Sequence, residues 1–331
     1  MSAQFKEVRC MTRFIVVSLL LWAGMSQPAF AEEPQTPIGP KWWPSEWGAG
    51  DQRGAANRVT PEKTLQGTKL IRSGKVYQLG RVYEDGMPLP EGRHLDVTIP
   101  ATPGGPFGDN QLIEIVDLVN GELGHVGTQL DGLGHVGVHL ADDDYFYNGF
   151  KRSEFSKPRG LAKLGVENIG AIFTRGVLID VANFKHVERL EPGYVITPQD
   201  LEATLKSEGV EVTPGDVVVF RTGHGKLWMK NNGLYNSGEP GIGMEAAHWL
   251  VEKKVVMVGS DTWANEAFPS PNKKTVVEAH QLLITRNGIY SLENLDLEQL
   301  AADKVYEFAF IFTPLKLKGA AGAPGNPIAV R

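Results

Sequence analysis

A glycine-rich segment at residues 124–135 constrains this chain more than any other stretch. It reads Gly-His-Val-Gly-Thr-Gln-Leu-Asp-Gly-Leu-Gly-His, with four glycines in twelve positions. Glycine destabilises a helix interior by about 1 kcal/mol relative to alanine, so a regular helix is not expected here. Glycines also let backbones approach closely, so the side chains between them can converge. The sequence therefore predicts a tightly folded loop that gathers polar side chains.

Four side chains in this loop can bind a metal ion or transfer protons: His125, Gln129, Asp131 and His135. His and Asp are common ligands of divalent cations, and Gln is a weaker, neutral oxygen donor. A bound cation can polarise a carbonyl and lower the pKa of water, and a further His can shuttle protons. The loop by itself equally fits two structural histidines beside an aspartate.

The N-terminus has the pattern of a secretory signal peptide. Lys6, Arg9 and Arg13 precede an apolar run at residues 14–25, and Ala-Phe-Ala at residues 29–31 offers a cleavage site. The run has about 12 residues, too few for a helix to span a bilayer core of about 30 Å. We expect a signal peptide at 1–31, a hydrolase domain at 32–331, and a periplasmic or secreted protein. An uncleaved anchor is the alternative, and either Met1 or Met11 can be the start.

The charge and cysteine content restrict the partners of the mature chain. Residues 1–31 carry Lys6, Arg9 and Arg13 against Glu7, a net charge of +2, so the chain's −6 becomes −8 without them. An acidic chain without a basic stripe is not expected to bind nucleic acid. The only cysteine, Cys10, leaves with the signal, which excludes disulfides. No second long apolar run follows, so no membrane association is expected after cleavage.

The pattern of strands and helices predicts a mixed α/β fold in a single domain, with a sheet covered by a second β layer and by helices. Thr197, Pro198 and Asp200 form a capping-box pattern, and Gly209 ends the helix they begin. Residues 32–70 are expected to be irregular, and Asn120-Gly121 to form a tight turn. The other expected elements are strands at 75–84, 94–100, 112–120, 176–182, 216–221, 255–259 and 305–315, and helices at 244–254 and 276–285.

The loop from His125 to His135 resembles the signature H-x-G-T-H-x-D-x-x-x-H of the metal-dependent cyclase / kynurenine formamidase (arylformamidase) family. It matches every defined position except one, where Gln129 replaces a histidine. The resemblance extends over roughly residues 45–328. Further stretches similar to the family are W-G-x-x-D-x-x-G-x-x-N at 47–57, G-D…R-T-G at 215–223, G-x-D-T at 259–262, H-x-L-L at 280–283 and E-N-L at 293–295.

This resemblance implies a swivelling β/β/α fold and a role for each matching residue. His125, Asp131, His280 and Glu293 would bind a divalent metal, Zn²⁺ or Mn²⁺, and Asp131 would bridge if there are two ions. Gln129 would occupy a ligand position with a weaker donor, so one or two ions are both open. His135 would be the catalytic acid–base. From the sequence alone His280 also fits the apolar face of a helix.

The family further implies an enzyme that hydrolyses an amide, formamide, lactone or cyclic imide. The leading expectation is an arylformamidase acting on a small molecule such as N-formylkynurenine, an intermediate of tryptophan catabolism. A dienelactone-type lactone hydrolase is the second hypothesis. A non-catalytic periplasmic ligand-binding protein with a degenerate metal site is the third, and Gln129 favours it, whereas His135 favours an enzyme. A homodimer or homotetramer is expected.

Overall fold

The computed structural model describes Met1 and residues 35–100 and 104–331. The predicted signal peptide therefore lies outside the described residues, Met1 excepted. Residues 35–331 form one compact unit. Within these described ranges, no helix is both long and apolar enough to cross a bilayer.

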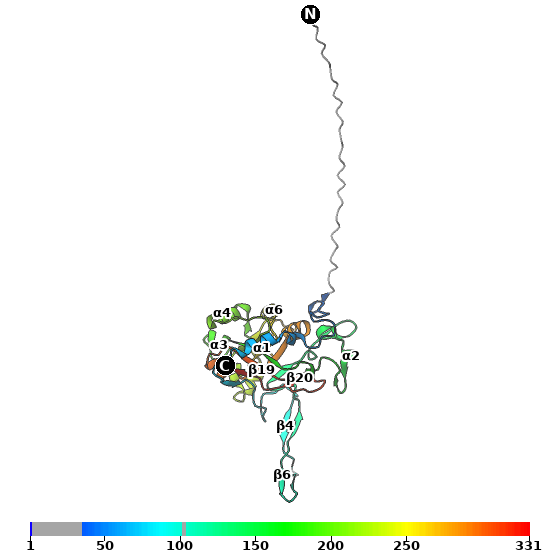
Figure 1. Cartoon of the computed structure of the whole chain (residues 1–331), viewed down its shortest axis with the longest axis vertical. Helices are drawn as coiled ribbons and strands as arrows, with labels where there is room; N and C mark the ends of the chain where they lie inside the picture. Colours follow the sequence, from blue (N-terminus) through cyan, green and yellow to red (C-terminus); the bar gives the residue numbers. More distant parts are fainter. Residues whose placement is uncertain (2–34, 101–103) are drawn as a thin grey trace. The chain divides into compact units, whose positions relative to one another are not determined.

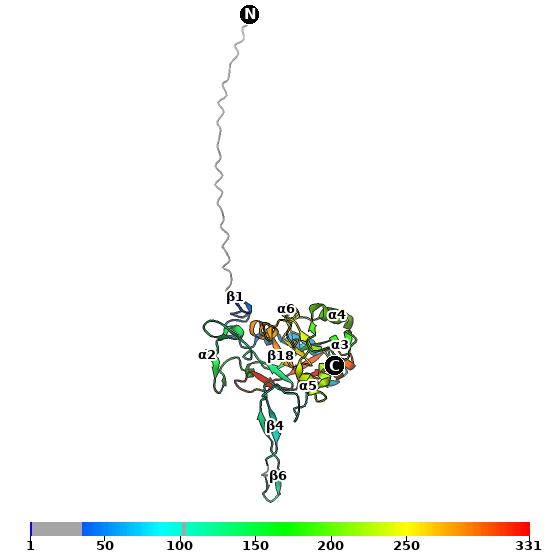
Figure 2. The same cartoon turned by 180° about the vertical axis from the view of Figure 1, so that it is seen from behind.

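A nine-stranded mixed sheet forms the centre of this unit (Figures 1 and 2). Four neighbouring strands run parallel, and the strands outside them are joined antiparallel. The predicted mixed α/β class is confirmed. The sheet order is β20 (Gly322–Pro324), β8 (Gln129–Asp131), β18 (Tyr290–Glu293), β17 (Met257–Ser260), β15 (Val217–Arg221), β13 (Ile172–Asp180), β19 (Glu307–Phe312), β21 (Ile328–Val330) and β3 (Val76–Gln78).

Both faces of the sheet are buried, and side-chain alternation along β13 separates two apolar clusters. Val177 and Ile179 belong to the cluster that includes the helices α4 (Pro198–Glu208) and α6 (Met244–Glu252). Leu178, between them, belongs to the other cluster. Successive strand side chains point to opposite faces, so a near-continuous apolar strand is what a sheet covered on both faces requires.

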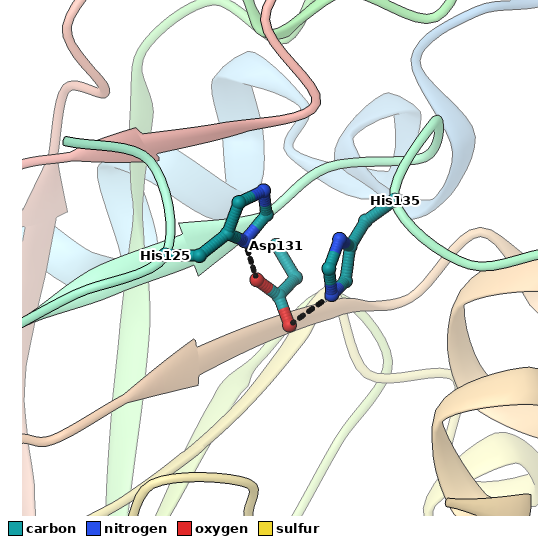
Figure 3. Close-up of side chains that lie close together, drawn as sticks. All are labelled: His125, Asp131 and His135. Carbon is teal, nitrogen blue, oxygen red and sulfur yellow. Dashed lines mark hydrogen bonds and ion pairs between the residues drawn. The ribbon is translucent and has the colours of Figure 1, made fainter. Parts of the chain in front are cut away.

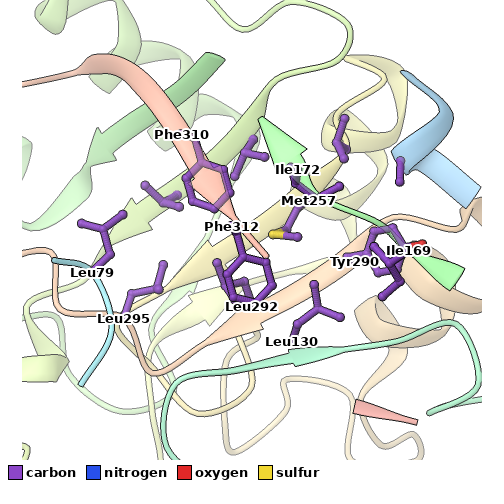
Figure 4. Close-up of a cluster of buried hydrophobic side chains, with 14 of the residues drawn as sticks. Leu79, Leu130, Ile169, Ile172, Met257, Tyr290, Leu292, Leu295, Phe310 and Phe312 are labelled. Atoms are coloured by element: carbon purple, nitrogen blue, oxygen red, sulfur yellow. The ribbon is translucent and has the colours of Figure 1, made fainter. Parts of the chain in front are cut away.

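The second cluster lies inside the curl of the sheet (Figure 4). Neighbouring and distant strands both contribute to it: Leu130 and Leu292 come from the paired strands β8 and β18, and Phe312 comes from β19, four strands beyond β18 in the sheet order. All three side chains are at most 1% exposed. Burying side chains of this size stabilises the fold by about 1.5–3 kcal/mol each, so this cluster fixes the position of β8 and of its polar residues.

The remaining elements are short. The other helices are α1 (Pro61–Thr68), α2 (Arg152–Phe155), α3 (Val181–Phe184), α5 (Asn232–Ser237), α7 (Glu278–His280), the π-helix η5 (Gln281–Arg286) and α8 (Glu298–Ala302), with 3₁₀ turns η1 (Gly54–Arg58), η2 (Tyr147–Gly149), η3 (Val166–Asn168) and η4 (His224–Leu227). The two-stranded pairs are β1 (Gln35–Thr36) with β2 (Gly39–Pro40), β4 (Leu95–Thr98) with β7 (Leu118–Gly121), β5 (Gly104–Phe107) with β6 (Leu112–Glu114), β9 (Val138–His139) with β10 (Asp144–Tyr145), β11 (Ser156–Lys157) with β12 (Gly160–Leu161), and β14 (Val195–Ile196) with β16 (Gly241–Ile242).

The best-supported local prediction is confirmed at α4. Thr197 accepts a hydrogen bond from the Asp200 amide, and the Asp200 carboxylate accepts one from the Thr197 amide. Gly209 ends the helix in the left-handed conformation. The expected segments 216–221 and 244–254 contain β15 and α6, and the expected strand 176–182 covers only the second half of β13, which begins at Ile172 and ends at Asp180.

Three predictions are wrong or incomplete. Asn120-Gly121 is not a turn, because both residues pair with Leu95 and Asp96 in the β4–β7 ladder and the chain reverses at residues 108–111. The stretch 32–70 contains the helix α1, which Thr60 caps. The expected helix at 276–285 is two short pieces, α7 and the π-helix η5.

A partly buried carboxylate at the end of α4, that of Glu208, makes the stability of the fold depend on pH. Burial raises the pKa of Glu208 to about 8, its hydrogen bond from the Asp180 amide opposes this, and the Asp180 charge adds to the rise. Glu208 is therefore protonated in the folded chain at neutral pH and ionised in the unfolded chain. The free energy of unfolding should fall as pH rises from about 4.5 to about 8 and then level off.

Glu208→Gln keeps the acceptor oxygen and removes the titration. We expect the variant to exceed the wild type by about 2 kcal/mol in free energy of unfolding at pH 8, after allowance for solvent screening, and to match it near pH 4.5. Urea unfolding at several pH values measures this difference. The exposed control Glu252→Gln should follow the wild-type curve. Parallel curves for wild type and Glu208→Gln would refute the assignment.

Candidate active site

The pairing of β8 with β18 aligns the polar residues of two distant segments. Glu293 lies opposite Gln129, and Ser291 lies opposite Asp131. Side chains alternate along a strand, so these four share one face of the pair while Leu130 packs into the core on the other. The register therefore places two predicted ligands of the loop beside one predicted ligand from the C-terminal part of the chain.

Gln129 presents a carbonyl oxygen to this face. Its Nε2 donates to Glu293 Oε2 at 2.7 Å. Its Oε1 is buried and has no hydrogen-bond partner among the described residues. A buried polar atom without a partner is destabilising by about 1–3 kcal/mol, so a ligand for this oxygen is expected.

His125, Asp131 and His135 meet within the same loop (Figure 3). His125 Nδ1 lies 3.0 Å from Asp131 Oδ1, and His135 Nε2 lies 3.7 Å from Asp131 Oδ2. The two imidazole rings stack with centroids 4.1 Å apart. Asp131 is 2% exposed, so both of its carboxylate oxygens are committed to this cluster.

His280, at the junction of α7 and η5, also approaches Asp131. Glu266 fixes its orientation, because Glu266 Oε1 lies 2.5 Å from His280 Nδ1 and the carboxylate also accepts the amides of Ala279 and His280. His280 Nε2 is thereby turned inward, 3.1 Å from Glu293 Oε1 and 3.7 Å from Asp131 Oδ2. An imidazole whose outer nitrogen is held by a carboxylate is the usual arrangement of a metal-binding histidine.

Two groups of donors with metal-ligand chemistry result, and both contain Asp131. One is His125, Asp131 and His135, and the other is Asp131, His280 and Glu293, with the ligand atoms of each group within 4.8 Å of one another. Imidazole nitrogens with carboxylate oxygens suit Zn²⁺ and Mn²⁺. The free oxygen of Gln129 adds a neutral donor beside them. The residues present therefore fit a divalent cation.

Burial and neighbouring charges shift the pKa values of the titratable side chains in this cluster. Burial opposes ionisation of Asp131, but His135, His125 and His280 hold its pKa well below the ordinary range. Burial and the charge of Asp131 raise the pKa of Glu293 to about 7. Burial lowers the pKa of His135 to about 4. His135 is therefore neutral near pH 7 and can accept a proton.

All six predicted residues line one cavity of about 710 Å³. Tyr235, Trp263 and Phe268 supply aromatic surface to it, and Arg93 supplies a positive charge. A volume of this order accommodates a small-molecule ligand. His224, by contrast, is buried behind the wall, where its ring stacks on Tyr235 and its Nε2 contacts the Tyr235 carbonyl oxygen.

The comparisons with known proteins decide the family. The family model named Cyclase matches residues 77–267, more than half of the chain. A crystal structure of a novel cyclase shares 32% sequence identity and superposes with a TM-score of 0.78, covering 86% of this chain and 96% of that one. This chain belongs to the cyclase family. The family and fold expected from the sequence motifs are thereby confirmed.

Two proteins that are similar to this chain are named isatin hydrolases. The curated isatin hydrolase of Roseibium aggregatum is 28% identical over 159 residues, which are 46% of this chain and 58% of that protein. The chain thus matches less than two thirds of the length of this curated relative. Isatin hydrolase A of Ralstonia solanacearum shares 20% identity and the fold, with a TM-score of 0.57 over 78% of this chain and 92% of that one. The expected class, a hydrolase acting on C–N bonds, agrees with these names.

Sequence reasoning missed Glu266, which no motif contains. It lies fourteen residues before His280, and only the packing of α7 brings the two together. Other motif residues of the cyclase-family chain have supporting roles. The Asp261 carboxylate accepts hydrogen bonds from the backbone amides of Gly223 and Gly225. The Asn294 side chain donates a hydrogen bond to the Gly127 carbonyl inside the glycine-rich loop.

Glu266→Gln tests whether the carboxylate orients His280. We expect metal affinity to fall by about 10–100-fold, because an amide holds the imidazole without the negative charge that raises its basicity. Isothermal titration with Zn²⁺ or Mn²⁺ measures the change, with Glu278→Gln, a half-buried glutamate on α7, as control. Wild-type affinity in Glu266→Gln would show that His280 is oriented by other contacts.

Proposed function

We propose that this chain hydrolyses the C–N bond of a formamide or cyclic amide attached to an aromatic ring, with a divalent metal held by His125, Gln129, Asp131, His280 and Glu293. The observation that carries the proposal is the convergence of these donors and a neutral His135 on one partly aromatic cavity. A cation bound there supplies a polarised carbonyl and a water of lowered pKa.

In this reaction His135 moves the proton. Its unprotonated imidazole accepts a proton from the attacking water as the water oxygen bonds to the carbonyl carbon. The same imidazole then gives that proton to the amide nitrogen as the C–N bond breaks. The products are a carboxylic acid, which is formic acid for a formamide, and an amine, so atoms and charge balance; the acid then releases its remaining proton to solvent. Asp131, 3.7 Å from His135 Nε2, favours the protonated imidazole between the two steps.

The cavity wall supports an aromatic substrate. Trp263 and Phe268 form an edge-to-face pair with centroids 5.4 Å apart, and both line the cavity with Tyr235. Arg93 suits a substrate or product that carries a carboxylate. Isatin, a lactam fused to a benzene ring, and N-formylkynurenine, an aryl formamide, both meet these requirements.

A substrate panel tests the proposal. Purified protein loaded with Zn²⁺ or Mn²⁺ should hydrolyse isatin or N-formylkynurenine faster than a dienelactone. Turnover of the dienelactone alone would support a lactone hydrolase instead. Tight binding of these compounds without turnover would support a ligand-binding protein.

We also propose that the chain is exported and cleaved after Ala31. The basic residues, apolar run and Ala-Phe-Ala of residues 1–31 support this. Mass spectrometry of protein expressed in a Gram-negative host should find Glu32 as the first residue in the periplasmic fraction. Periplasmic protein that retains residues 14–31 would contradict cleavage.

A further inference from the structure

One fully buried carboxyl group beside the cavity takes no part in the reaction proposed above. Glu239 is 0% exposed and is not among the residues that line the cavity. The partners of its side chain among the described residues are backbone amides. Burying a carboxyl group is unfavourable unless it is hydrogen-bonded, so the position of these amides indicates what Glu239 does.

The Glu239 side chain holds one end of the aromatic wall of the cavity. Its Oε2 accepts a hydrogen bond from the Trp263 amide at 2.5 Å, and its Oε1 accepts one from the Ala264 amide at 2.8 Å. Two consecutive amides bound to one carboxyl group cannot rotate independently, so the direction in which the Trp263 side chain leaves the backbone is fixed. The indole Nε1 then donates to the Tyr235 carbonyl at 3.2 Å.

The backbone of Glu239 holds the other end of this wall. Its amide donates to the Phe268 carbonyl at 2.8 Å, and the Phe268 amide donates to the Glu239 carbonyl at 2.9 Å. The ring of Phe268 lines the cavity and meets the Trp263 ring edge-to-face. One residue outside the cavity therefore fixes both members of the aromatic pair.

The metal ligands are held by other contacts. Between Trp263 and Phe268, the Asn265 carbonyl accepts the Ile242 amide at 2.9 Å, and Glu266 orients His280. Neither contact involves the Glu239 side chain. A change confined to that side chain is therefore expected to disturb the aromatic wall and to spare the metal donors.

We propose that Glu239 is a positioning residue for substrate binding, which orients Trp263 beside Phe268 so that the pair receives the aromatic ring of the substrate. This inference rests on the aromatic substrate proposed above. Orientation matters because aromatic rings attract one another in offset-stacked or edge-to-face arrangements. Since Glu239 does not line the cavity, it acts on KM through Trp263 and not on the proton transfer.

Steady-state kinetics of Glu239→Gln with N-formylkynurenine or isatin tests the proposal. Glutamine has one acceptor oxygen, and its amide nitrogen is a donor that would face the second backbone N–H. We expect KM to rise about 10-fold, the scale of a lost aromatic contact, while kcat and metal content change by less than about 3-fold. A wild-type KM, or a fall in kcat as large as the rise in KM, overturns the proposal.

Asp51→Asn is the matched control. Asp51 also accepts two consecutive backbone amides, those of Arg53 and Gly54, but it does not line the cavity or contact its wall residues. Its KM should equal that of the wild type. If Glu239→Gln does not fold, Glu239→Asp replaces it. This variant keeps both acceptor oxygens on a shorter side chain, and should show the same rise in KM to a smaller extent; an unchanged KM overturns the proposal.

A double-mutant cycle identifies the residue through which Glu239 acts. Trp263→Ala should raise KM about as much as Glu239→Gln does, and combining the two should raise it no further, because both remove one contact. Effects that multiply would show that Glu239 acts through another residue, which overturns the proposal.

Fluorine NMR of protein labelled with 5-fluorotryptophan makes the test independent of turnover. The chain contains seven Trp residues, and Trp263→Phe identifies the Trp263 signal by its loss. This signal should shift in Glu239→Gln and stay in place in Asp51→Asn. A shifted signal in a protein that hydrolyses none of the substrates would refute the proposed function and support the positioning role. An unshifted Trp263 signal overturns the positioning role.

Discussion

Asp131→Ala should remove most of the bound metal and all measurable hydrolysis. Asp131 is the one residue shared by both donor groups, and both of its oxygens face histidines. Its loss leaves Glu293 as the single carboxylate of the second donor group and removes the residue that joins this group to His125. We expect metal content below roughly a tenth of the wild-type value and a rate lower by more than about 10³-fold.

Elemental analysis and turnover on the same sample measure both effects. Asp144→Ala is the matched control, because Asp144 also pairs with a histidine, His139, at 2.7 Å but lies on the surface. That variant should keep its metal and its rate. Wild-type metal content in Asp131→Ala would place the metal elsewhere.

His135→Gln should retain its metal and fold but lose about 10²–10⁴-fold in kcat. Glutamine can hydrogen-bond at this position but cannot accept a proton near neutral pH. The lowered pKa of His135, about 4, keeps the imidazole unprotonated and ready to act as the base. Because proton transfer and metal binding are separate tasks, the loss should appear in kcat while metal affinity stays near its wild-type value.

Comparing kcat with metal content separates the two roles of a histidine. The exposed control His139→Gln should change neither quantity. A metal-free His135→Gln would make His135 a ligand, as its membership of the first donor group allows. Full activity with full metal would assign the proton transfer to another residue.

Local sequence patterns predicted those parts of the fold whose determinants are local. The capping box, whose two residues Thr197 and Asp200 are three positions apart, determines where α4 begins. The glycines of residues 124–135 likewise determine that the segment containing Asp131 is a loop and not a helix. The predicted turn at Asn120-Gly121 was wrong because the pairing of β4 with β7 extends through those residues. Pairing partners are set by long-range register, which a local pattern does not contain.

The site divides in the same way. The motif placed Gln129 at the position of a ligand. Only the register of β8 and β18 shows that the amide nitrogen of Gln129 donates to Glu293 and that its amide oxygen has no hydrogen-bond partner among the described residues. The orienting role of Glu266 likewise depends on the path of the chain into α7. Neither feature has a sequence spacing that would predict it.

One measurement tests the central claim most directly: anomalous diffraction at the metal edge from crystals of the protein grown with Mn²⁺ or Zn²⁺. A peak bounded by Asp131, His280 and Glu293, alone or with a second peak beside His125, is the predicted result. A map with no peak in this cavity, or with its only peak at the surface acidic residues 142–144, would contradict the assignment.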